Sequence, residues 1–217
     1  PVGVGASSFR KQTAEQLLKE VRFDAIRGNI SEIKTLASLC GTQEKNSGNM
    51  AVSDTMDVEK ITDKSDHCGK ITGIDGSGRG VDADNADTVT EENLAQHISN
   101  AKMLSKKLQT IVAITGAIDL VTDGSSCYVI RNGNPQMGHV TGAGCQLSGI
   151  LTAFLAANPE NKLQAAAAAV CMMGYAGELA AEKSGQSGSG TYRVSLMDAV
   201  SCMDGDILER GARYEIR

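Results

Sequence analysis

Helical and strand periodicities alternate along the first part of the chain. Apolar residues recur at helical spacing from Lys11 to Val21, and the stretch from Phe23 to Arg27 then reads as a short strand that stops at Gly28. Further helices are predicted from Ser31 to about Leu39 and from Glu91 to Leu108. This alternation predicts an α/β fold with a mostly parallel central sheet flanked by helices.

The second half begins with the clearest strand pattern of the sequence. Thr110 to Thr115 is an apolar run typical of a buried strand. Leu120–Gly124 and Cys127–Arg131 predict a hairpin that turns near Asp123 and Gly124. Four helices are then predicted, at Gly144–Ala157, Lys162–Lys183, Tyr192–Met203 and Gly205–Ala212.

Two features bear on the extent of the domain. Residues 40–79 are rich in Ser, Asp, Gly, Thr and Lys without periodicity, which predicts an atypical insertion that forms a flexible loop. The chain also opens at Pro1 directly into the glycine-rich run Val2–Ala6, and a loop of this kind normally follows a strand. We therefore interpret residues 1–217 as a single, incomplete domain that lacks its first strands.

Composition excludes several classes of function. The net charge is −5 and the basic residues are scattered, so the sequence shows no footprint for nucleic acid or for an anionic membrane surface. No apolar run approaches the roughly 20 residues that span a bilayer. The six cysteines form no C-x-x-C pair, which favours free thiols in a reducing, cytoplasmic compartment.

The most informative segment is Val140–Ser148, in which small residues open directly into an apolar helix. Glycines at positions 142 and 144 allow a close approach of the main chain to an anion, and a helix N-terminus favours negative charge there. The thiol of Cys145 lies in the first helical turn, where its thiolate form is favoured. It is a candidate nucleophile or a base that orients and deprotonates a hydroxyl, and equally a buried Cys at an ordinary helix start.

Four segments together carry a specific resemblance. They are Pro1–Ala6, Arg27–Ile33, Ala113–Gly116 and Val140–Ser148. In this order they resemble the hydroxyethylthiazole kinase family of the ribokinase-like superfamily. The resemblance covers Pro1 to about Leu39 and Gly80 to the end, and leaves the 40–79 insertion unmatched.

The resemblance implies roles for particular residues. Cys145 occupies the position where related sugar kinases have a catalytic Asp, which argues against a sugar kinase. Gly142, Ala143 and Gly144 would form the anion hole for the transferred phosphoryl group, with Gly142 also near the thiazole substrate. Arg27 and Thr115 resemble the ATP-binding residues of the family, although a surface Arg and a strand-terminal Thr are also commonplace.

The resemblance also implies a metal site. Asn29 and Glu32 match an N-x-x-E element whose carboxylate organises Mg2+, usually through water because this ion dehydrates reluctantly. The same two residues also fit an N-cap with a capping-box Glu, and the two interpretations are compatible.

The resemblance thus implies an enzyme that uses ATP and Mg2+ to phosphorylate the hydroxyl of 4-methyl-5-(2-hydroxyethyl)thiazole in thiamine biosynthesis or salvage. The resemblance further implies a homotrimer with sites at subunit interfaces. In fungi such kinases are joined to thiamine-phosphate synthase, so the resemblance also makes this synthase a candidate fusion partner. Two alternatives remain open: a ribokinase-like kinase for a pyrimidine or pyridoxal-type alcohol, and an inactive truncated domain that serves as a scaffold.

Overall fold

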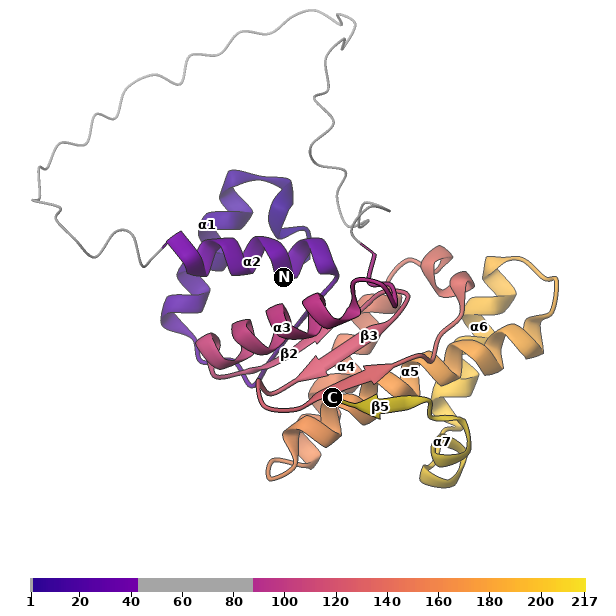
Figure 1. Cartoon of the computed structure of the whole chain (residues 1–217). Coiled ribbons are helices and arrows are strands. Elements are labelled where there is room, and N and C mark those ends of the chain that lie inside the picture. Colours follow the sequence, from indigo (N-terminus) through magenta and orange to yellow (C-terminus); the bar gives the residue numbers. More distant parts are fainter. Residues whose placement is uncertain (1, 43–87) are drawn as a thin grey trace, which may run out of the picture.

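A central sheet with helices on both faces forms the fold (Figure 1). The structure is a computed structural model that describes residues 2–42 and 88–217. The strands are β1 (Ala25–Gly28), β2 (Ile111–Ile114), β3 (Asp119–Thr122), β4 (Cys127–Ile130) and β5 (Tyr214–Ile216). They form one sheet in the order β1-β2-β3-β4-β5. The predicted α/β class is confirmed.

The direction of the strands differs from the prediction. Only β1 and β2 run parallel, whereas β2–β3, β3–β4 and β4–β5 are antiparallel among the described residues. The expectation of a mostly parallel sheet is therefore wrong for this part of the molecule. The reason is the way the strands are connected: a crossover through helices joins the parallel strands β1 and β2, whereas tight turns join β2 to β3 and β3 to β4. Strand β5 returns antiparallel to β4 after a long helical connection.

Helices α1 (Ser8–Glu20), α2 (Ile30–Thr42) and α3 (Leu94–Leu108) lie on one side of the sheet (Figure 1). Period-two alternation turns Val112, Ile114 and Leu120 toward this layer. The short 3-10 turn η1 (Val4–Ala6) adds Val4, which is buried. The first turn of α2 is thereby packed next to the first residues of the chain.

Helices α4 (Ala143–Ala157), α5 (Lys162–Ser184), α6 (Ser189–Ser201) and α7 (Gly205–Gly211) form the other layer (Figure 1). Alanines of α5 pack against Ala113, Val121 and Ile130 of the sheet. Small side chains allow helices and sheet to approach closely, so a core with few aromatic residues is densely filled. Among the described helices only α5 is long and apolar enough to cross a membrane, and 67% of its apolar window is buried within the fold.

Most predicted elements are confirmed with small shifts at their ends. The hairpin turns at Asp123–Gly124 as predicted, and Gly124 has a φ of 93°. Helix α2 continues to Thr42 and so includes the first residues of the predicted loop at 40–79, whose other residues lie outside the described part. The sequence did not predict β5 or the 3-10 helix η4 (Pro135–His139).

Candidate active site

A pocket of about 680 Å3 opens where β1, β2 and β4 end and where α2 and α4 begin. Its lining includes every residue that the sequence singled out for chemistry: Arg27, Asn29, Glu32, Thr115, Gly142, Ala143, Gly144 and Cys145. These residues come from three separate segments of the chain, at positions 27–32, 115 and 142–145. The fold therefore brings the candidate residues to one place.

The head of α4 faces this pocket and carries no side-chain cap from the described residues. Gly142 is the N-cap and adopts φ 93° and ψ −1°, a left-handed conformation that glycine accommodates without strain. The Ala143 N–H donates to the carbonyl of Val140 at 3.2 Å, so the part of the anion-hole prediction that used this amide is not supported. The amides of Gly144 and Cys145 are the second and third of the helix, where the helix itself provides no acceptor.

Cys145 is exposed and lines the pocket from the first turn of α4. This placement differs from that of Cys127 and Cys171, which are buried in the core. Burial raises the pKa of Cys127 to about 11 and that of Cys171 to about 12, so both remain neutral thiols at physiological pH. Of these three sulfurs only that of Cys145 is open to a substrate.

Arg27 extends from β1 toward the head of α4. Its Nη1 donates to the hydroxyl of Thr115 at 3.2 Å. A side chain at position 144 would meet Nη2 and Nη1 of Arg27 at 3.2 and 3.3 Å, so the guanidinium lies directly against Gly144. Its Nε is buried without a hydrogen-bond partner among the described residues. A fixed cation thus lies beside the free amides of the helix, an arrangement that suits phosphate.

The Glu32 carboxylate is buried and accepts two backbone hydrogen bonds. Oε2 accepts from the Asn29 N–H at 3.0 Å and Oε1 from the Gly3 N–H at 2.7 Å. In return the Glu32 N–H donates to Asn29 Oδ1 at 2.9 Å, which completes a reciprocal capping box. The structural interpretation of the Asn29–Glu32 pair is therefore confirmed, and the carboxylate also borders the pocket.

The donor set limits the kind of metal that this region can hold. No group of three or more His, Cys, Asp or Glu side chains within residues 2–42 and 88–217 is arranged for direct metal binding. Mg2+ is usually held by one or two carboxylates, substrate phosphates and several waters. Glu32, beside Asn29 at the edge of the pocket, fits such a water-mediated contact, since each carboxylate oxygen has a lone pair beyond its bond to the backbone.

Sequence reasoning missed an acidic group in the pocket, Asp119 at the start of β3. Its Oδ1 accepts from the Gly116 N–H at 2.8 Å. Burial raises the pKa of this carboxyl to about 7, against the lowering effects of the Gly116 hydrogen bond and of the Arg27 charge. The only signal in the sequence was a single acidic residue ahead of a strand, which is typical of an ordinary turn.

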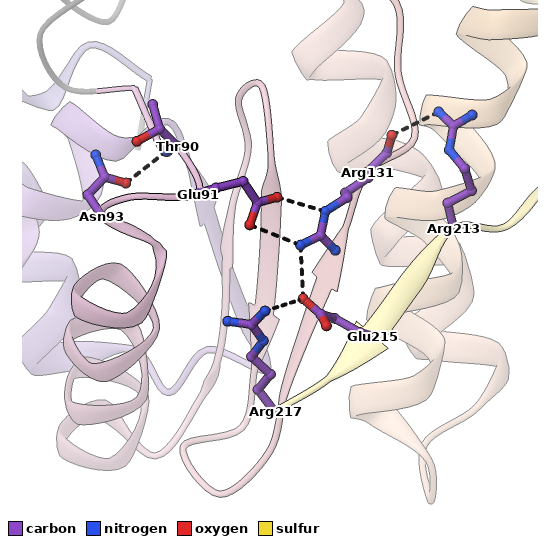
Figure 2. Close-up of polar contacts among 7 residues, drawn as sticks. All are labelled: Thr90, Glu91, Asn93, Arg131, Arg213, Glu215 and Arg217. Carbon is purple, nitrogen blue, oxygen red and sulfur yellow. Dashed lines mark hydrogen bonds and ion pairs between the residues drawn. The ribbon is translucent and has the colours of Figure 1, made fainter.

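A cluster of charged side chains borders the pocket at Arg131 (Figure 2). Arg131 binds Glu91 through Nε at 3.0 Å and Nη2 at 3.3 Å, and its Nη2 also contacts Glu215 at 2.9 Å. Arg217 binds the same Glu215 at 2.7 Å. These partly exposed pairs contribute little stability singly, but together they attach β5 and the segment before α3 to the end of β4.

A second cavity, of about 660 Å3, lies beside β1 between α1, α2 and α4. Its walls are mainly apolar, with Leu17, Phe23 and Leu155 among them. Of the candidate residues only Arg27 reaches it. The chemistry predicted from the sequence therefore belongs to the first pocket.

Comparison with known proteins gives a consistent result. The model of the hydroxyethylthiazole kinase family matches residues 1–69 and 53–206. A protein of Clostridium acetobutylicum named hydroxyethylthiazole kinase is 44% identical over 99% of this chain and 66% of its own length. A protein of the same name from Desulfovibrio desulfuricans is 35% identical over 100% of this chain and 66% of its own length.

Among solved structures, a hydroxyethylthiazole kinase from Pyrococcus horikoshii matches with a TM-score of 0.69. Its sequence identity is 24%, and the match covers 100% of this chain and 63% of that one. This likeness supports the fold. The chain spans just under two thirds of the length of the relatives that it matches.

Proposed function

The chain belongs to the hydroxyethylthiazole kinase family, and from this premise we propose that its protein transfers the γ-phosphoryl group of ATP to the hydroxyl of 4-methyl-5-(2-hydroxyethyl)thiazole in thiamine biosynthesis or salvage. The observation that supports the proposal most directly is the shared pocket. It combines a cation on a strand end, free amides at a helix head, an exposed thiol and a buried carboxylate. Phosphoryl transfer depends mainly on positioning and on charge stabilisation, which these groups provide.

In the proposed reaction the alcohol oxygen forms a bond to the γ-phosphorus of ATP. The bond from this phosphorus to the bridging oxygen breaks, and ADP leaves. Cys145, in its thiolate form, orients the hydroxyl and accepts its proton at Sγ to become the neutral thiol, because it is the exposed cysteine beside the helix head. Amides of Gly144 and Cys145 stabilise the charge on the moving phosphoryl group, while Gly142 gives the main chain its turn and borders the substrate.

Arg27 and Thr115 are proposed to bind ATP. The guanidinium contacts the Thr115 hydroxyl and the head of α4 at once, so a phosphate there would meet a positive charge and backbone donors together. Mg2+, when bound, neutralises phosphate charge, and Glu32 with Asn29 would hold it through water. The buried Nε of Arg27, which has no partner among the described residues, is a further donor in this region.

The test of the proposed function is a substrate comparison with the full-length protein. It is incubated with ATP and Mg2+ and, separately, with the thiazole alcohol, a hydroxymethylpyrimidine and a pyridoxal-type alcohol. We expect phosphate ester and ADP in equal amounts from the thiazole alcohol. Phosphorylation of only the pyrimidine or the pyridoxal-type alcohol would instead identify the protein as one of the alternative vitamin kinases.

An inactive scaffold is the remaining alternative. A calorimetric titration with ATP distinguishes it, since a kinase site requires nucleotide affinity that depends on Mg2+. Binding that is absent with and without Mg2+ would favour the scaffold. A homotrimer, a cytoplasmic location and a fusion to thiamine-phosphate synthase stay predictions of the family resemblance, and light scattering on the purified protein tests the first.

A further inference from the structure

Asp119 is an unexpected group in this pocket, because burying a carboxylate is costly and an apolar side chain could fill the same space. The proposed reaction assigns it no task. It starts β3 on the face of the sheet that packs against α4 and α5, together with Val121. Arg27 is on the same face of β1, two residues after Ala25.

The register of the sheet puts Asp119 next to the ATP-binding residues proposed above. Ile114 pairs with Leu120, so the next antiparallel pair along the register is Thr115 with Asp119. The turn between these strands is four residues long, Thr115 to Ile118, and its Gly116 N–H is held by Asp119 Oδ1 at 2.8 Å. Asp119 therefore closes the turn that begins with Thr115.

A continuous series of contacts leads from this turn to the head of α4. The Thr115 N–H donates to the carbonyl of Gly28 at 2.9 Å, and the Thr115 hydroxyl accepts from Arg27 Nη1 at 3.2 Å. The same guanidinium lies against Gly144. If the turn shifted, the hydroxyl that anchors Arg27 would shift with it.

We infer that Asp119 is a positioning residue of the nucleotide site: it fixes the 115–118 turn so that Thr115 holds the Arg27 guanidinium against the head of α4. This inference rests on the proposed function, since it concerns the binding of ATP at that site. Asp119 acts through Thr115 and Arg27, and its Oδ1 accepts from the Gly116 amide.

The charge of Asp119 also affects the binding of ATP. The groups facing it from neighbouring elements are Arg27 of β1 and the neutral thiol of Cys171 on α5. Because the pKa of Asp119 is raised to about 7, the carboxyl is mostly neutral below this pH and mostly ionised above it. The ionised form offsets the Arg27 charge, so ATP binding by the natural protein weakens as the pH rises through 7.

The experiment compares Asp119→Asn and Asp119→Ala in the full-length protein. The amide of Asn keeps an acceptor for Gly116 and loses the charge, whereas Ala loses both. We expect Asp119→Ala to raise the KM for ATP about tenfold while kcat changes less than about twofold, and Asp119→Asn to restore the KM to near that of the natural protein at pH 6. Asp123→Asn is the matched control, because Asp123 also closes a turn but is exposed and outside the pocket.

A pH series supplies the readout that a merely structural role would not change. The ratio of the ATP KM of the natural protein to that of Asp119→Asn cancels the ionisation of ATP itself. We expect this ratio to rise about threefold between pH 6 and 8. A flat ratio overturns the inference, as does an unchanged ATP KM in Asp119→Ala or an equal loss of kcat in both variants.

Failure of the proposed function gives a different result. In that case the natural protein forms no thiazole phosphate, and the same variants are compared by calorimetric ATP titration. Weaker ATP binding in Asp119→Ala with recovery in Asp119→Asn supports the positioning role without turnover. Equal binding by both variants and the natural protein contradicts it.

Discussion

The heads of α2 and α4 face the same pocket, yet their first turns are satisfied in opposite ways. At α2, Asn29 and Glu32 cap each other at 2.9 and 3.0 Å, and Glu32 also takes the Gly3 N–H. At α4 the N-cap is Gly142, and no side chain of the described residues caps the helix. At α2, side chains therefore satisfy backbone N–H groups of the first turn, whereas at α4 backbone N–H groups of the first turn remain available to an anion.

Because of this difference, the two helix starts in the pocket suit ligands of opposite charge. The α2 head holds a negative carboxylate in a fixed position, which suits a contact with the waters of a cation. The α4 head presents N–H groups and lies beside the positive charge of Arg27, which suits phosphate. The three changes below test whether the two heads are as different in function as they are in geometry.

The largest effect is expected from Cys145→Ser at the α4 head. Because Cys145 is the exposed thiol of the pocket, its loss should lower kcat by about 100-fold or more while the ATP KM changes little. Steady-state kinetics measure both constants. Cys202→Ser, at an exposed thiol outside the pocket, is the control, and an unchanged kcat in Cys145→Ser would remove Cys145 from the chemistry.

A smaller effect is expected from Gly144→Ala in the same turn. The new methyl group would lie 3.2 Å from Arg27 Nη2 and push the guanidinium away from the helix head. We expect the ATP KM to rise about fivefold to tenfold, as for a weakened charge-assisted hydrogen bond.

Gly149→Ala provides the matched control for this change. It lies on the same helix, and nothing is within 4 Å of its added methyl group. Both variants replace a glycine of α4 by alanine, and only the one at position 144 meets Arg27, so a difference in their ATP KM reports this contact. Equal values in the two variants would mean that the guanidinium does not depend on the space at Gly144.

The smallest effect is expected from Glu32→Gln at the α2 head. The amide retains one acceptor for the two backbone N–H groups, so the free energy of unfolding should fall by about 1 kcal/mol. Urea denaturation measures this loss, with the exposed Glu182→Gln as control. The Mg2+ concentration for half-maximal activity should also rise, and a change in stability alone would leave Glu32 with only its capping role.

The sequence predicted the helix starts of the site because their signals are local. Glycine at 142 and 144 and the Asn29–Glu32 spacing determine their own first turns, whatever packs around them. The resemblance added the expectation that Arg27 and Thr115 act with them. Their meeting in one pocket depends on pairing between β1 and β2, which are more than 80 residues apart in the sequence.

Features that depend on tertiary contacts could not be predicted in this way. Strand β5 is three residues long and mostly exposed, so its sequence is too short to carry a clear strand pattern. It is held as a strand by pairing with β4 and by the ion pair between Arg131 and Glu215. Asp119 resembles a loop residue until β3 and α5 bury it. The family resemblance implied an anion-hole role for the Ala143 amide, and only the turn at Val140 revealed its hydrogen-bond partner.

The contrast between exposed and buried cysteines has a practical consequence for chemical labelling. An alkylating reagent should modify Cys145 and Cys202 among the described thiols and spare Cys40, Cys127 and Cys171. Since Cys145 borders the pocket and Cys202 does not, a nucleotide that occupies the pocket should protect the first site and leave the second reactive. Mass spectrometry of labelled peptides would then report occupancy of the pocket without any assay of turnover.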